Sequence, residues 1–245
     1  NLLQVTAEEL PFFTNFKAYT IEALSLKVAA QISLKHFDNA RKTLISLRYP
    51  ETLSTYYLLS GDLSYEEGKF EEALHYYDRL LEHQSDLSEN TLFKIASSKL
   101  RSRPSDPSIS EDLLTVILKD NSFLTAYDLL FKLLEVSKDT KVLEVIARVP
   151  KTPEYYFAVI KFYFLGNNYE EVVKNALDFE SLGDVPGKEH YAFFIGEFYY
   201  KSLVKLDKVF EVLEKRYEPT LGTPKNLDLF FQLHHLLHLE NGKTT

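Results

Sequence analysis

The sequence predicts an all-helical fold built from antiparallel helix pairs. Only 8 glycines and 9 prolines interrupt 245 residues, and no strand-like alternation of apolar and polar residues occurs. The stretch from 58 to 81, LLSGDLSYEEGKFEEALHYYDRLL, shows one such pair most clearly, with Gly68 and Lys69 at the turn. After the turn, Phe70, Ala73, Tyr77 and Leu80 recur at helical spacing and face the first helix, which Gly61 allows to come close.

Five other stretches show the same pattern, and Gly61 serves as the reference position. The equivalent residues of the first helices are Val28, Gly61, Ser97, Phe131, Ile160 and Gly196, at spacings of 33, 36, 34, 29 and 36. The second helices are expected to bury Ala40, Ala73, Leu113, Ala147, Ala176 and Val209, together with neighbours such as Ile109, Leu143, Val172 and Val212. The mean spacing is close to 34 residues, which predicts a helical repeat.

This pattern resembles the tetratricopeptide repeat, a unit of about 34 residues with a small residue, a turn glycine and aromatic residues at fixed offsets. The resemblance covers about residues 14–217. It implies one superhelical solenoid over 1–245, with about six repeats in 12–217, an N-terminal cover segment in 1–11 and a C-terminal capping helix in 224–239.

The first predicted helix, Phe12 to Leu34, carries apolar residues around most of its circumference. Such a helix must be covered on most sides. Two interpretations remain open: residues 1–11 fold back over it, or a second copy of the chain covers it. The residues expected in the second case to form a homodimer interface are Phe12, Phe13, Phe16 and Tyr19.

Composition limits the partners. The 36 acidic residues outnumber the 28 Lys and Arg, giving a net charge of −8 that would repel a phosphate backbone, so we expect no nucleic-acid partner. No apolar run is long enough to span a membrane, so we expect no membrane partner. The absence of cysteine is typical of a reducing compartment, and we expect an intracellular protein, nuclear or cytoplasmic.

The search for chemistry favours a protein that is not an enzyme. No glycines have the spacing of a phosphate-binding loop. His234 and His238 have the spacing of two zinc ligands, but His235 stands beside His234 where a metalloprotease has its general base, glutamate. We interpret these histidines as part of the capping helix. Paired glutamates such as Glu71 and Glu72 open second helices, where negative charge is favourable. We expect no catalytic residues, no cofactor and no metal.

In tetratricopeptide arrays the residue after the small reference position points into a groove, and chaperone-binding members place asparagine there with lysine nearby. Here Asp62 follows Gly61 and Glu197 follows Gly196, so a partner's carboxylate would be repelled. The groove is expected to contain Asp62, Tyr65, Tyr163, Glu197 and Tyr200, and to suit a basic or neutral segment. Aromatic residues crowd the helices around 155–164 and 191–200, more than the core contacts require.

One segment, Leu118 to Leu130, resembles a repeat junction in scaffold subunits of the anaphase-promoting complex, a cell-cycle ubiquitin ligase. Those subunits also carry a proline- and serine-rich loop one helix upstream, as Arg101 to Ser108 is here. The resemblance implies a homodimeric scaffold that holds other protein subunits. The alternative is a monomeric adaptor that binds a peptide or cargo segment in its groove, in a transport or chaperone pathway.

The assignment of Ala73 to a helix crossing predicts that Ala73→Glu strongly destabilises the protein, because it buries a charge between two helices. Thermal unfolding followed by circular dichroism measures the change. A soluble variant with an unchanged melting temperature would refute the position assigned to Ala73.

Overall fold

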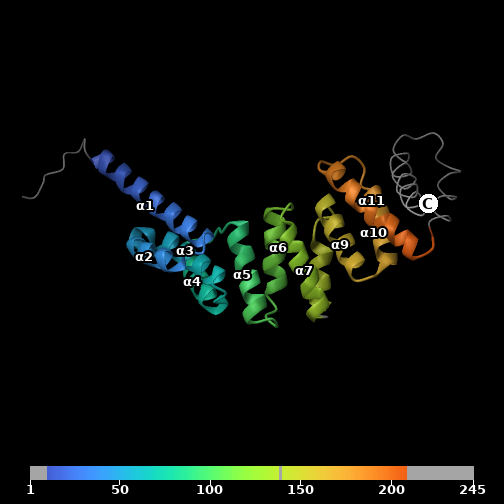
Figure 1. Cartoon of the computed structure of the whole chain (residues 1–245), viewed down its shortest axis with the longest axis horizontal. Helices are drawn as coiled ribbons and strands as arrows, with labels where there is room; N and C mark the ends of the chain where they lie inside the picture. The colour runs from blue at the N-terminus through green and yellow to red at the C-terminus, as the bar shows by residue number, and fades with distance from the viewer. Residues whose placement is uncertain (1–9, 138–139, 209–245) are drawn as a thin grey trace, which may run out of the picture. The chain divides into compact units, whose positions relative to one another are not determined.

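The computed structural model describes residues 10–137 and 140–208. These ranges contain eleven α-helices, two short 3₁₀ helices and no strand (Figure 1). The prediction of an all-α fold is therefore confirmed.

The chain divides into two compact units, 1–119 and 120–245, and each is described by itself. The single array over 1–245 therefore stays a prediction. Unit 1 contains α1 (Leu10–Ser33), α2 (Phe37–Leu44), the 3₁₀ helices Ile45–Leu47 and Pro50–Thr52, α3 (Leu53–Glu66), α4 (Phe70–His83), α5 (Glu89–Ser102) and α6 (Ile109–Lys119). Unit 2 contains α7 (Leu124–Ser137), α8 (Thr140–Arg148), α9 (Pro153–Leu165), α10 (Tyr169–Glu180) and α11 (Lys188–Lys205).

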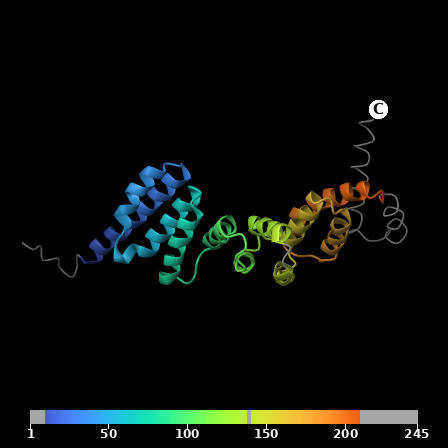
Figure 2. The ribbon, with the colours of Figure 1, turned by 90° about the horizontal axis from the view of Figure 1, so that it is seen from below.

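Consecutive helices form hairpins: α1 packs with α2, α3 with α4, α5 with α6, α7 with α8 and α9 with α10. The pairs α1–α2 and α3–α4 can be followed in Figures 1 and 2. We call α1, α3, α5, α7, α9 and α11 the first helices. Neighbouring first helices also pack on one another, α1 on α3 and α3 on α5 in unit 1, and α7 on α9 and α9 on α11 in unit 2. Within each unit, neighbouring hairpins thus pack on one another through their first helices.

Helices α3 and α4 pack closely at Gly61. A Cβ atom at Gly61 would lie 2.5 Å from Cε1 of Tyr77, so only a glycine admits the ring at this depth. Tyr77 is 1% exposed and Ala73 is fully buried beside it. The sequence-based positions of Gly61, Ala73 and Tyr77 are confirmed.

The reference position is buried on every first helix. Val28, Gly61, Ser97, Phe131, Ile160 and Gly196 all lie in the interior. The second-helix positions Ala40, Ala73, Leu113 and Ala176 are buried as predicted. Val209 and Val212 lie outside the described residues. The register read from the sequence is therefore correct for most of the hairpins.

A common turn ends four of the first helices, α1, α3, α9 and α11. Gly68 has a positive φ of 77°, and the next N–H, of Lys69, donates to the carbonyl of Ser64 at 2.8 Å. Lys35, Asn167 and Asp207 hold the same left-handed conformation after α1, α9 and α11. In this turn the N–H after the left-handed residue donates to the carbonyl five residues earlier, which the end of the helix would otherwise leave without a partner. The four turns repeat one structure, although only the turn after α3 has glycine at the left-handed position.

The register predicted for α8 is wrong. Leu143 is 53% exposed and Ala147 is also exposed, whereas Val142, Val145 and Val149 are buried. The buried residues follow the local apolar stripe at i, i+3 and i+7, of which Val142 and Val145 lie in α8 and Val149 directly after it. The offsets of the earlier hairpins, counted from Phe131, give Leu143 and Ala147 and therefore miss this stripe.

The start and the burial of α1 also differ from expectation. The helix begins at Leu10, so Leu10 and Pro11 belong to it rather than to a separate cover segment. Proline is tolerated in the first turn, where its missing N–H has no helical partner. In the described part of α1, one stripe packs on the core, with Val28 and Ile32 buried, while Leu26 and Leu34 are 65% and 66% exposed.

We predict that Gly61→Ala lowers the stability of the protein by about 1–3 kcal/mol, the usual cost of overpacking a core, since the new methyl group must displace the buried ring of Tyr77. Urea unfolding measures this change. Gly166→Ala is the matched control, because its new Cβ would meet only backbone oxygens at ordinary contact distances of 3.5 and 3.6 Å. Equal stability of the two variants would contradict the close approach at Gly61.

Candidate functional site

In unit 1, Asp62 lies in a polar network rather than on an open acidic surface. Its Oδ1 atom is 2.9 Å from Nζ of Lys94 on α5 and accepts a hydrogen bond of 2.8 Å from the hydroxyl of Tyr77. The charge of Asp62 is therefore compensated inside the protein. This corrects the expectation of an uncompensated carboxylate that attracts a basic segment.

Tyr65 also joins neighbouring helices. Its hydroxyl lies 3.2 Å from Oγ of Ser97, and its ring meets that of Phe70 edge to face at 5.9 Å. Nζ of Lys94 lies 5.9 Å from the centre of the same ring. Tyr65 is half-buried. These contacts give it a packing role between α3 and α5, and only part of the side chain remains for a partner.

Unit 2 contains a cavity of about 510 Å³ between α7 and α9, which we call the α7/α9 cavity. Phe131 and Phe162 form its apolar wall, with stacked rings 5.2 Å apart. Tyr163, predicted to lie in a groove, belongs to the lining, and burial raises the pKa of its hydroxyl. The remaining lining residues are Asp128, Lys132, Glu135, Lys161, Leu165, Gly166 and Asn168.

The charged side chains of the α7/α9 cavity differ in how they are compensated. Nζ of Lys161 lies 3.0 and 2.8 Å from the two carboxylate oxygens of Asp128, so these charges cancel. Lys132 and Glu135 are exposed on α7, and within residues 10–137 and 140–208 neither forms an ion pair or hydrogen bond. One cation and one anion, three residues apart on one helix, are therefore left at the cavity.

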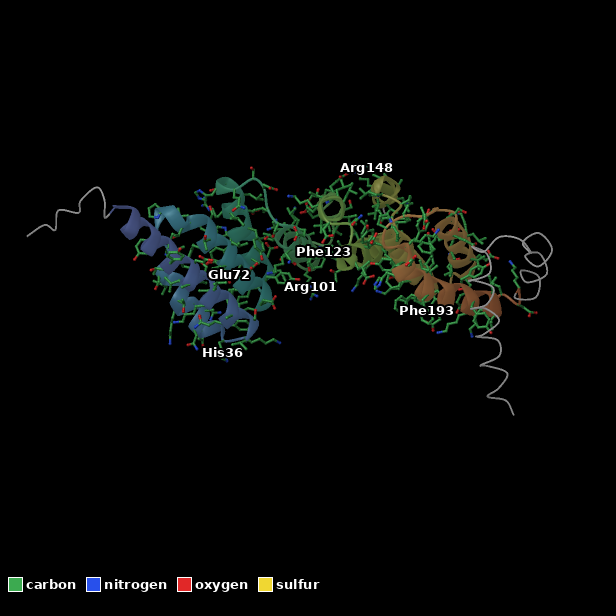
Figure 3. The ribbon with its side chains drawn as sticks, turned by 90° about the horizontal axis from the view of Figure 1, so that it is seen from above. His36, Glu72, Arg101, Phe123, Arg148 and Phe193 are labelled. Carbon is green, nitrogen blue, oxygen red and sulfur yellow. The ribbon has the colours of Figure 1, made fainter. Side chains whose placement is uncertain are left out.

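Aromatic side chains of α9 and α11 form a separate cluster that reaches the surface. Phe157 contacts Phe194 and Phe198 at centroid distances of 6.0 and 6.4 Å, and Phe164 contacts Phe198 at 4.9 Å. Phe193 is 60% exposed and lies at the outer edge of α11 (Figure 3). The excess of aromatic residues in these helices thus includes exposed rings, as the sequence predicted.

The other predicted groove residues of unit 2 behave differently. Glu197 pairs with Lys201 on its own helix at 2.5 Å, so its charge is compensated as well. Tyr200 is 3% exposed and cannot present its ring to a partner, which corrects its assignment to the groove. Asp62 and Tyr65 belong to unit 1, so the structure groups them separately from Tyr163 and Glu197.

Of the predicted dimer residues, only Tyr19 has a described side chain, and it is 70% exposed. The side chains of Phe12, Phe13 and Phe16 lie outside those described, although their backbone is part of α1. Figure 1 shows the first turns of α1 extending past α2 and α3.

The lysines of the network and of the cavity were not among the predicted site residues. Lys161 follows its partner Asp128 by 33 residues, and Lys94 follows Asp62 by a nearly equal interval. This interval is close to one repeat, so an acidic residue and a lysine one repeat apart are the signal that would have identified both pairs.

Among the described residues, no group of three His, Cys, Asp or Glu side chains is arranged to hold a metal ion. His234 and His238 lie outside these residues. In the same ranges no helix has the length and apolar character needed to cross a membrane. Comparison with protein-family models, curated proteins and solved structures found no match. Function is therefore inferred from the residues of this chain.

We predict that Tyr77→Phe lowers the free energy of unfolding by about 1–2 kcal/mol, because the Asp62 carboxylate loses a buried hydroxyl donor. Ser98→Ala is the control, since it also removes one buried hydroxyl from unit 1, and Oγ of Ser98 has no hydrogen-bond partner in the described structure. We expect Ser98→Ala to be neutral or stabilising in urea unfolding. If both variants lost the same stability, the Tyr77–Asp62 bond would not be the cause.

Proposed function

We propose that this chain is a non-catalytic scaffold of the tetratricopeptide-repeat type, which joins protein subunits and associates with a second copy of itself. The supporting observation is the recurrence of one buried position on all six first helices, from Val28 to Gly196. Stacked repeats bury one face of each helix pair and leave an extended row of helix surfaces exposed. Repeat proteins bind partner proteins on such surfaces.

Self-association is supported by α1. Tyr19 and Leu26 are both more than half exposed, and the helix extends past α2 (Figure 1). Phe12, Phe13 and Phe16 continue the apolar sequence toward its N-terminal end. Large apolar side chains gathered on one element are typical of a protein interface. The proposed dimer places these residues of two copies against each other.

The finer proposal is a scaffold subunit of the anaphase-promoting complex or of a similar assembly. It rests on the resemblance of Leu118 to Leu130 and of the loop from Arg101 to Ser108 to those subunits. In this proposal the protein acts in the nucleus, and its other partners are protein subunits of the ligase.

A monomeric adaptor is the second candidate, and a specific observation favours it. The α7/α9 cavity offers a site with an apolar wall on two first helices of unit 2 without a second copy. A peptide or cargo segment would bind there. The two candidates differ in whether the isolated protein is a dimer.

Light scattering over a wide concentration range tests self-association. We expect a mass of twice 28.4 kDa that persists on dilution. Charge repulsion between copies should reduce it to the monomer mass in the double variant Phe16→Glu with Tyr19→Glu. The control Leu81→Glu changes another exposed apolar residue, on α4, and should leave the dimer intact. A wild-type monomer at all concentrations would exclude the dimeric scaffold and leave the adaptor.

A further inference from the structure

The α7/α9 cavity has a lining that selects among possible occupants. Its volume of about 510 Å³ falls within the range of about 300–1,000 Å³ found for binding sites. Phe131 is 3% exposed and holds its ring against Phe162, so the wall is built into the core rather than formed by loose surface side chains. Leu165, which is 70% exposed, adds an apolar residue to the lining. An apolar group of a partner fits this lining.

The charges around the cavity argue against an anion such as a terminal carboxylate or a phosphate. Such a group is bound best by two or more converging donors. Lys161 already pairs with both oxygens of Asp128, and the other lysine, Lys132, stands three residues from Glu135. The charges of these four side chains sum to zero. The site therefore offers no excess of positive charge.

Lys132 and Glu135 form no ion pair among the described residues, so both charges are open to an occupant that carries both signs. Neighbours three residues apart on a helix have Cβ atoms about 5–6 Å apart. An acidic and a basic residue close together in a partner segment match this spacing. The four lining charges sum to zero and give no preference for the single charge of a chain end, so we place the segment within a chain.

We infer that the α7/α9 cavity binds an internal segment of a partner protein, which inserts one aromatic or leucine side chain and pairs an acidic residue with Lys132 and a basic residue with Glu135. The inference rests on the proposed function as a protein-binding scaffold. The inference adds the surface that binds the partner and the chemistry of the partner segment.

Selection of random 12-residue peptides displayed on phage against the full chain tests this proposal. Peptides retained by the variant Leu165→Lys, which places a charge in the apolar lining at an exposed position, are discarded first. We expect the remaining peptides to share an aromatic residue or leucine with one acidic and one basic residue within four positions. No enrichment, or enriched peptides without this pattern, would overturn the proposal.

The charge swap Lys132→Glu with Glu135→Lys gives the sharper measurement and keeps the net charge of the protein. Fluorescence anisotropy of a labelled selected peptide should show at least about tenfold weaker binding to this variant, since two attractive pairs become repulsive. A peptide with its acidic and basic residues exchanged should recover affinity. The control swap Glu22→Lys with Lys27→Glu changes two exposed residues of α1 and should leave affinity unchanged.

Binding that is indifferent to the swap at Lys132 and Glu135 would also overturn the proposal. The light-scattering experiment does not depend on this site, so a dimer that binds no such peptide would retain the scaffold function and lose only the cavity. A monomer that binds the peptide would exclude the dimeric scaffold and retain the α7/α9 cavity as a binding site.

Discussion

The packing of one hairpin against the next is the constraint on which the rest of the structure depends. A single hairpin leaves an apolar face open to water, and the next first helix covers it. In unit 1, α3 contributes Leu59 and Leu63 to the core of the first hairpin, while its Tyr57 and Leu58 pack on the core of the second. One helix thus serves two cores. The contact of Gly61 with Tyr77 brings α3 and α4 close enough for this to happen.

This packing also decides which polar groups remain for a partner. Ion pairs join neighbouring first helices, Asp62 with Lys94 in unit 1 and Asp128 with Lys161 in unit 2. Partly exposed pairs of this kind contribute at most about 1 kcal/mol each. Their larger consequence is that these charges are compensated within the protein, so that Lys132 and Glu135 are the charges left uncompensated at the α7/α9 cavity.

The predictable part of the fold is the part that repeats. Gly61, Ala73 and Tyr77 were placed correctly because their sizes fit only one position in a closely packed hairpin. The error in α8 has the opposite cause. A fixed offset from the reference position assigned Leu143 and Ala147 to the core, but Val142 and Val145 of α8 and Val149 just after it are buried, because the local apolar stripe determines which face packs. Local periodicity was the better guide there.

The sequence by itself determined the all-helical class, the turn after Gly61 and the buried position of each first helix, since these follow from periodicity, turn residues and residue size. Only the tertiary structure decided which side chains are free for function. Phe193 and Tyr200 lie seven residues apart and therefore on the same side of α11, yet one is 60% exposed and the other 3%. Likewise, the sequence around Asp62 indicates an unpaired carboxylate, whereas in the structure Asp62 pairs with Lys94 and accepts a hydrogen bond from Tyr77. Burial and charge compensation depend on neighbours from other helices, which are distant in the sequence.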